Sequence, residues 1–232
     1  MKLGGGHFFH RLADEQQRAL RPHAARRVLS KGEKLFLHGD VASDVFIIVA
    51  GHVKLTVASH DGRQVLVEVR GYGDLIGELA LLGDGTRSAS AFALTSPTEF
   101  LVVSRRSFEE LMLADPAMNR ALLEDLAEKL RMSAFRQLEL AVDDVSGRVV
   151  RRLIELAERF GEVAEDGTAT LRSPITQQDI ADWAGVSRQA VVKELRTLRD
   201  AGAIETQGSR FTLIDRNVLD ERVERLGAPS SL

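Results

Sequence analysis

The side chains with the clearest binding chemistry lie in residues 77–89, GELALLGDGTRSA. Glu78 supplies a carboxylate, and Arg87, nine positions later, supplies a guanidinium with Ser88 beside it. A carboxylate accepts hydrogen bonds from vicinal hydroxyls such as those of a ribose, whereas a guanidinium and backbone N–H groups hold a phosphate. The spacing therefore fits a small anion that carries hydroxyl groups. Taken by itself, however, the stretch is explained more simply by a structural ion pair between Glu78 and Arg87.

A second stretch, ITQQDIADWAGVSRQAVVKELRTLRDAGAI (175–204), carries chemistry for nucleic acid. Thr176 can cap a short helix, Gly185 suits the tight turn after it, and Ser187 can cap a second helix. Together, the two helices and the turn form a helix-turn-helix. Residues 187–199 hold four basic and one acidic side chain, although the whole chain has a net charge of −3. A locally basic helix is typical of contact with phosphates. A solvated charged face is the plainer alternative, but the caps and the turn at this spacing disfavour it.

The N-terminal residues of such a second helix reach base edges. Arg188 is the candidate for bidentate contact with guanine and Gln189 for adenine, whereas Lys193 suits guanine or a phosphate. The sequence AIETQGSRFTLID after the helix predicts two short strands with a turn at Gly208-Ser209, a wing. The predicted DNA contacts are Thr176, Gln178, Ser187, Arg188, Gln189, Lys193 and Arg210.

These side chains need elements to position them. Residues 9–28 suggest short helical segments, and from about Arg27 to Val103 short β-branched runs alternate with glycine-rich breaks, with Asp61-Gly62 as a hairpin signal. This pattern predicts a β sandwich or barrel. Helices follow from Ser107, with a break at Asp115-Pro116.

A long helix is predicted over residues 116–142. It has two apolar lines, which fit packing against its own β domain and against a second copy. Packing against its own domain alone is the simpler alternative. The first line is Leu123, Leu126, Leu130, Ser133, Gln137 and Leu140, and the second is Leu122, Met132, Phe135 and Leu138. A capped helix over 145–160 and a polar loop (162–168) come next, so the predicted domains are 1–115, 116–142 and 143–232.

Composition excludes several classes of protein. The chain of 232 residues has no cysteine, which removes disulfides, iron–sulfur clusters and a thiol nucleophile. No apolar run reaches the roughly 18 residues of a membrane span, and the N-terminus lacks a signal-peptide pattern, so a cytoplasmic protein is expected. Because no metal-ligand cluster, Walker loop or nucleophile–base spacing is present, we expect neither an enzyme nor a metal site.

Residues 77–89 resemble the phosphate-binding cassette of cyclic-nucleotide-binding domains, with the pattern G-E-L-A followed by R-S-A. Residues 31–55 resemble the glycine-punctuated β-roll of the same domain. With a long helix and SRQAVVKELRTL behind them, residues 10–220 resemble the CRP/FNR family of transcription regulators, and most of all its cyclic-AMP receptor branch. The resemblance implies an α+β fold: an N-terminal β-roll (jelly-roll-like cyclic-nucleotide-binding domain), a long dimerisation helix and a C-terminal winged helix-turn-helix.

The resemblance also assigns roles to residues. Glu78 would bind the ribose 2′-hydroxyl, and Arg87 and Ser88 the cyclic phosphate, assisted by Gly77 and the amides near Leu79 and Ala80. Ser133 stands where the family has a residue that contacts adenine. Four positions depart from the family's pattern. Thr86 stands where proline is usual in the cassette, and Ala134 stands where the base-contacting segment often has serine. Gln189 and Lys193 replace the glutamate and arginine of the readout helix, so an operator that differs from the receptor's consensus is expected.

The implied effector is cyclic AMP, with cyclic GMP open, and the implied partners are double-stranded DNA, a second copy of the chain and RNA polymerase. Ligand binding would shift the population toward the DNA-binding conformation by extending or reorienting the dimer helix near Asp143-Asp144. Alternatives within the family are a haem or gas sensor, or a regulator that needs no ligand.

Overall fold

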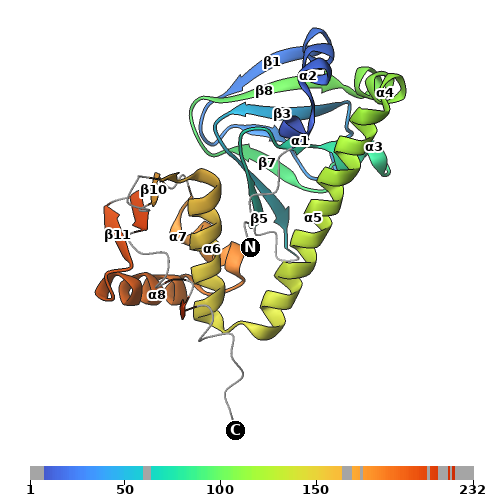
Figure 1. The fold of residues 1–232 in the computed structure, drawn as a ribbon. Helices are drawn as coiled ribbons and strands as arrows, with labels where there is room; N and C mark the ends of the chain where they lie inside the picture. The colour runs from blue at the N-terminus through green and yellow to red at the C-terminus, as the bar shows by residue number, and fades with distance from the viewer. Residues whose placement is uncertain are drawn as a thin grey trace. The chain divides into compact units, whose positions relative to one another are not determined.

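The computed structural model describes residues 8–59, 64–163, 169–172, 175–207, 210–213, 219 and 221–222 (Figure 1). The chain divides into two compact units between Arg131 and Met132, inside the long helix. The N-terminal unit contains α1 (Phe8–Arg11), α2 (Asp14–Leu20), η1 (Arg21–His23), β1 (Ala24–Leu29), β2 (Lys34–Phe36), β3 (Asp44–Ala50), β4 (Val53–Ala58), β5 (Gln64–Arg70), β6 (Leu75–Ile76), α3 (Glu78–Leu82), β7 (Ser90–Ala93), β8 (Thr98–Ser104) and α4 (Arg105–Ala114).

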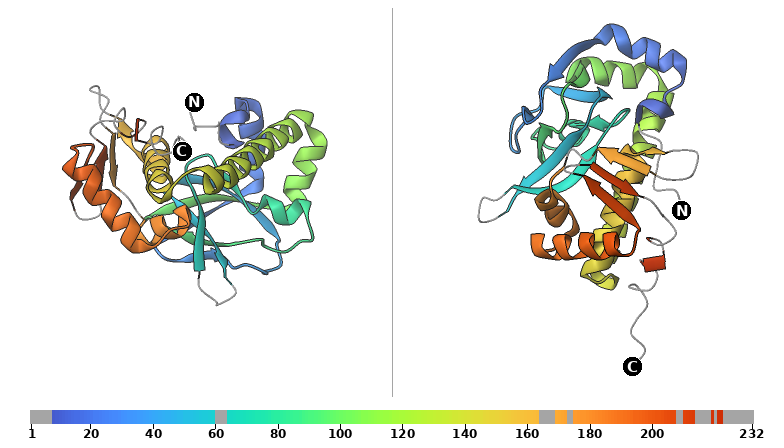
Figure 2. Two further views of the ribbon diagram at one scale, coloured as in Figure 1. Left: turned by 90° about the horizontal axis from the view of Figure 1, so that it is seen from below. Right: turned by 90° about the vertical axis from the view of Figure 1, so that its left-hand side faces the viewer.

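Two antiparallel sheets form the β-roll of this unit (Figure 2). Their strand orders are β1-β8-β3-β6 and β2-β7-β4-β5. Apolar residues from both sheets meet in one cluster, in which Phe46 and Phe100 pack edge to face with ring centroids 6.2 Å apart. A second cluster joins β3 and β8 to the flanking helices α1, α2, α4 and α5. The predicted β-roll is therefore confirmed.

Two local predictions in this unit were wrong. Residues 24–27 belong to strand β1 and not to a helix. They pair with β8 in a register that sets Ala24 opposite Val103. Residues 78–82 form the short helix α3 inside a region that was predicted to be β. The turn predicted at Asp61-Gly62 lies outside the described residues, although the flanking strands β4 and β5 do pair.

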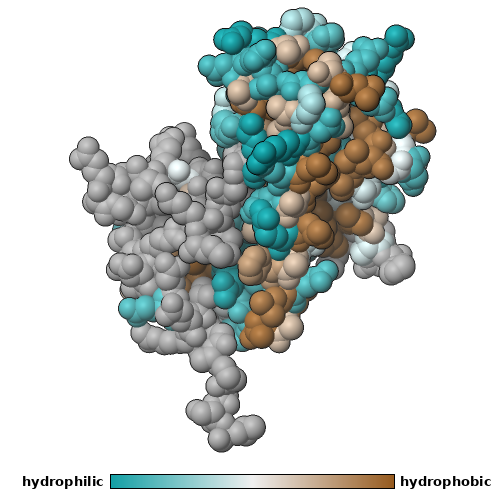
Figure 3. All heavy atoms as spheres, turned by 45° about the vertical axis from the view of Figure 1, so that its right-hand side comes forward, coloured by the Kyte–Doolittle hydropathy of each residue, from teal (hydrophilic) through white to brown (hydrophobic). Residues whose placement is uncertain are grey.

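The long helix α5 (Pro116–Val142) has the predicted bounds. Its apolar lines are only partly covered. Leu122 and Met132 are buried, whereas much of the rest faces solvent: Leu123, Leu130, Phe135, Leu138 and Leu140. Within the N-terminal unit, Figure 3 shows apolar side chains gathered on the face that carries α3 and the first part of α5.

The C-terminal unit contains α6 (Val145–Phe160), β9 (Glu162–Val163), β10 (Ala169–Arg172), α7 (Gln177–Ala184), α8 (Arg188–Asp200), β11 (Ile204–Gln207) and β12 (Arg210–Leu213). The Asp144 side chain caps α6 by accepting from Gly147 N at 2.7 Å. The strands form one sheet in the order β11-β12-β10-β9. The predicted wing strands are thus confirmed, but residues 162–163, predicted as loop, form β9.

Buried ion pairs fasten the last turns of α5 to α6 within the C-terminal unit. Arg152 pairs with Glu139 and, at 2.7 Å, with Glu155, which also pairs with Arg136 at 3.1 Å. Arg136 and Arg152 both lie over the ring of Trp183 in α7, 5.5 and 5.3 Å from its centroid. The end of α5 therefore belongs to the same packed body as the helix-turn-helix.

The β-roll core generates a stability prediction. Phe100 is fully buried, so Phe100→Ala is expected to lower the free energy of unfolding by about 3–5 kcal/mol through lost burial and a cavity. Leu113→Ala is the control, since Leu113 is 87% exposed and its truncation is expected to cost less than about 0.5 kcal/mol. Urea unfolding followed by circular dichroism measures both; equal losses would contradict the placement of Phe100 in the core.

Candidate functional site

The cassette of residues 77–89 is held in place by backbone hydrogen bonds to a distant loop. Arg87 N donates to Asp40 O at 2.9 Å, Gly39 N donates to Arg87 O at 2.9 Å, and Ala42 N donates to Gly85 O at 2.8 Å. The Asp84 side chain accepts from the Thr86 amide at 2.9 Å, which fixes the turn between α3 and β7. These bonds set the direction of the Arg87 side chain.

Arg87 is a buried cation, and no carboxylate of the described residues lies within ion-pair distance of it. Its side chain donates to two backbone oxygens, Gly77 O at 3.0 Å and Asp44 O at 2.8 Å. The guanidinium carbon lies 4.4 Å from the ring centroid of Phe36 and 5.3 Å from that of Phe46. Within the described part of the chain, no ion pair includes Arg87. Burial lowers the pKa of its guanidinium, against the opposing effect of nearby carboxylates.

Gly77 is required by this geometry. It precedes α3 with a φ of 85°, a conformation that side chains rarely adopt, and a Cβ atom there would lie 2.3 Å from Nη1 of Arg87. The glycine therefore lets the guanidinium reach the Gly77 carbonyl.

A cavity of about 350 Å³ opens beside Arg87. Its walls come from β2, β4, β5, β6, α3, the cassette and α5: Phe36, Leu55, Glu68, Arg70, Leu75, Ile76, Gly77, Glu78, Leu79, Ala80, Arg87, Ser88, Ala89, Leu126, Lys129 and Leu130. Six of the seven predicted ligand residues line it, from Gly77 to Ala80 together with Arg87 and Ser88. The seventh, Ser133, is exposed on α5, one helical turn beyond Lys129.

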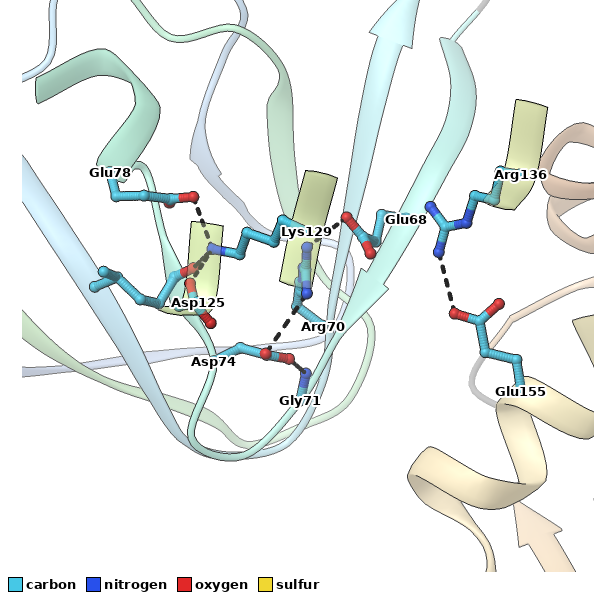
Figure 4. A network of polar contacts seen from close by, with 10 residues as sticks. Glu68, Arg70, Gly71, Asp74, Glu78, Asp125, Lys129, Arg136 and Glu155 are labelled. Atoms are coloured by element: carbon cyan, nitrogen blue, oxygen red, sulfur yellow. Dashed lines mark hydrogen bonds and ion pairs between the residues drawn. The ribbon is translucent and has the colours of Figure 1, made fainter. Parts of the chain in front are cut away.

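Glu78 pairs with Lys129 rather than with Arg87 (Figure 4). Lys129 Nζ lies 2.7 Å from Glu78 Oε1 and 2.8 Å from Asp125 Oδ2, and it donates to Leu75 O at 2.9 Å. The direct Glu78–Arg87 ion pair suggested by spacing alone is therefore not formed. Burial acts to lower the pKa of Lys129, but the adjacent carboxylates outweigh it and the pKa is raised. Burial raises the pKa of Asp125, against the effect of Lys129.

Three charged residues of the cavity wall were not predicted from the sequence: Glu68, Arg70 and Lys129. For Lys129 a signal existed, because Asp125 and Lys129 stand four positions apart on a helix, where opposite charges pair. For Glu68 and Arg70 the alternation of β5 predicts a shared face, but not that this face borders a cavity.

The second site is the exposed face of α8. Ser187 caps the helix by accepting from Ala190 N at 3.2 Å, and Val191, Leu195 and Leu198 form its buried stripe, as predicted. The exposed polar side chains at its N-terminal half are Arg188, Gln189 and Lys193. A basic face of this kind suits contact with phosphates and base edges.

The remaining predicted DNA residues surround this helix. Thr176 forms a capping box with Asp179, and Gly185 adopts a φ of 64° at the turn, so the helix-turn-helix geometry is confirmed. Gln178 is exposed and its amide donates to Asp182 Oδ1 at 2.9 Å. Arg210 lies in β12, with its side chain outside the described part of the structure.

The described residues contain no group of three or more His, Asp or Glu side chains that could hold a metal ion. Within the same residues, no helix is long and apolar enough to cross a membrane.

The fold and the two sites together define a regulator with a ligand-binding β-roll and a helix-turn-helix. The family profile described as "Cyclic nucleotide-binding domain" matches residues 26–115, and that described as "Crp-like helix-turn-helix domain" matches residues 147–222. The "CRP-like cAMP-activated global transcriptional regulator" of Mycobacterium tuberculosis is 33% identical over 83% of this chain and 85% of its own length. The chain belongs to the CRP/FNR family of transcription regulators.

Other relatives agree on the family or on the fold. The "Cyclic AMP receptor protein" of Thermus thermophilus is 28% identical over 94% of this chain and 97% of its own. The solved structure of FixK2 from Bradyrhizobium japonicum, 25% identical, superposes with a TM-score of 0.75 over 90% of this chain and 99% of FixK2. The "c-di-GMP Responsive Global Regulator CLP" of Xanthomonas campestris, 23% identical, shares the fold over 88% of this chain and 100% of its own, with a TM-score of 0.73.

Gly77 generates a testable prediction. Gly77→Ala is expected to destabilise the protein more than Gly32→Ala does, because both glycines have a φ of 85° but nothing lies within 4 Å of a Cβ at Gly32. Both variants carry backbone strain of about 1–2 kcal/mol, whereas Gly77→Ala must also displace Arg87. The difference between the free energies of unfolding of the two variants, measured in urea, gives the cost of the contact between Arg87 and the Cβ atom that Gly77→Ala adds. Equal destabilisation would contradict the close approach of Arg87 to Gly77.

Proposed function

We propose that this chain is a transcription regulator controlled by a cyclic nucleotide, with cyclic AMP as its effector. The observation that carries the proposal is Arg87, a residue that is 4% exposed and whose guanidinium has no carboxylate within ion-pair distance among the described residues. A buried charge is costly unless it is paired. A ligand anion in the adjacent cavity would supply the missing partner.

The charges of the cavity wall fit a single anion. Arg70 is paired with Glu68 and Asp74, and Lys129 is paired with Glu78 and Asp125. Among the described residues, this leaves Arg87 as the cation of the wall that forms no ion pair. A cyclic phosphodiester carries one negative charge, and Glu78 supplies an acceptor for ribose hydroxyls. The other walls are apolar, with Leu55, Ile76 and Leu126 among them, and suit the faces of a base.

The relatives favour cyclic AMP among such ligands. The Mycobacterium tuberculosis relative is named as cAMP-activated and the Thermus thermophilus relative as a cyclic AMP receptor protein. The Xanthomonas campestris regulator, which shares only the fold, is described as responsive to c-di-GMP. A regulator of the same family that senses another ligand, or none, is therefore the second candidate.

The ion pair between Glu78 and Lys129 supports a route from ligand to the long helix. Ribose hydroxyls that bind Glu78 would compete with Lys129, which belongs to α5. If the two states of α5 differ in this contact, the ligand shifts their populations. The exposed leucines of α5 favour a homodimer, whose two α8 helices would enter successive major grooves about 34 Å apart. Activation would then follow from contact with RNA polymerase.

Calorimetric titration with cyclic AMP and cyclic GMP tests the effector. We expect micromolar or tighter binding by the wild type, loss of binding in Arg87→Ala, and unchanged binding in Arg106→Ala, a matched control whose side chain is 88% exposed. The absence of heat with either nucleotide, together with a folded protein, would refute the proposal and favour the second candidate.

DNA binding gives a separate prediction. A duplex sequence selected from a random library in the presence of cyclic AMP should bind the wild type with an affinity that rises when cyclic AMP is added. Arg188→Ala is expected to lose about 1–3 kcal/mol of binding free energy and to relax preference at one base pair. Fluorescence anisotropy measures the affinity, with Arg106→Ala again as the control. An unchanged affinity and base preference in Arg188→Ala would contradict the assignment of α8.

A further inference from the structure

The exposed face of α8 carries one large apolar side chain among polar ones. Val192 is 44% exposed, whereas Val191, Leu195 and Leu198, the other large apolar residues of this helix, are buried. The remaining exposed residues of α8 are polar or charged: Arg188, Gln189, Lys193, Arg196, Arg199 and Asp200.

Val192 lies among the residues expected to read base edges. Because α8 begins at Arg188, Val192 opens its second turn. At about 3.6 residues per turn, Val192 lies between Arg188 and Gln189 around the helix axis and one turn further along. The second helix of a helix-turn-helix contacts base edges in the major groove with its N-terminal residues. A duplex that contacts Arg188 and Gln189 therefore meets Val192 as well.

The fold gives no reason for a valine at this position. Valine loses side-chain freedom in a helix and forms helices less readily than alanine, so alanine at an exposed position would make α8 slightly more stable. A single exposed apolar residue needs no explanation on an ordinary surface. On a face that reads DNA, however, its side chain has no charge for a phosphate and no donor or acceptor for a base.

The major groove offers such a side chain one matching feature. Guanine, cytosine and adenine present hydrogen-bond donors and acceptors at their edges, whereas thymine adds an apolar C5-methyl group. Contact between the valine methyl groups and this methyl group would remove apolar surface of both partners from water.

We propose that Val192 is a specificity-determining residue that packs on the C5-methyl group of a thymine in the operator. Cytosine at the same position has hydrogen at C5 and leaves the contact incomplete, and a purine presents polar atoms instead. The inference rests on the part of the proposed function that makes α8 the DNA-reading helix. The identity of the effector does not enter it.

Replacement of thymine by deoxyuridine tests the contact, because uracil lacks only the C5-methyl group. The wild-type full-length protein selects a duplex from a random library, with and without cyclic AMP, and the thymines of that duplex are then replaced one at a time. We expect one replacement in each half-site to weaken wild-type binding about three- to fivefold, as for one buried methyl group, and to leave the binding of Val192→Ala unchanged. Fluorescence anisotropy measures the affinities.

Two measurements separate recognition from folding. Val192→Ala is expected to have a Tm no lower than that of the wild type, since alanine is the better helix former. The matched control is Val145→Ala, because Val145 is 45% exposed at the start of α6 and its truncation should leave the response to deoxyuridine unchanged.

The outcomes distinguish this inference from the proposed function. A selected site without thymine, a wild type that is insensitive to every replacement, or a Val192→Ala variant that responds as the wild type does would each overturn the role of Val192, while a loss of affinity in Arg188→Ala would still support α8 as the reading helix. A wild type that binds no duplex would refute both.

Discussion

The structure depends on one buried guanidinium. Arg87 is held by two backbone carbonyls and two phenyl rings, and these partners orient the cation without neutralising it. Carbonyl dipoles and aromatic faces stabilise a positive charge less than a carboxylate does. The guanidinium therefore keeps a positive charge that, under the proposed function, the ligand anion would neutralise.

The elements around Arg87 make room for its guanidinium and hold its backbone in place. Gly77 leaves room for the guanidinium, and the loop around Asp40 fixes the backbone of Arg87. On the other side of the cavity, Glu78 is paired with Lys129 on α5, so the residue proposed for the ribose is already in contact with the helix proposed for dimerisation. In the C-terminal unit, the ion pairs of Arg152 join the end of α5 to α6. Each unit thus includes a segment of the same helix.

Local features of the fold could be predicted from the sequence, whereas contacts between distant residues could not. The bounds of α5, α7 and α8 follow from capping residues, proline and apolar periodicity, which act over a few positions. The short helix α3 was missed because five residues between glycines show too little periodicity. The partner of Glu78 was missed as well, since Lys129 is 51 positions away and only the folded β-roll brings them together. The cassette residues were assigned by resemblance, and the spacing of Glu78 and Arg87 alone would have paired them with each other.

The central claim is that the phosphate of the ligand is the missing counter-charge of Arg87. The most direct test compares the affinities of cyclic AMP and of adenosine, its neutral counterpart, for the wild type and for Arg87→Met by calorimetry. The account predicts that the wild type prefers cyclic AMP by about 30-fold or more, as expected for a hydrogen bond to a charged group, and that Arg87→Met binds both alike. A wild type that binds adenosine as tightly, or an Arg87→Met variant that keeps the full preference, would contradict it.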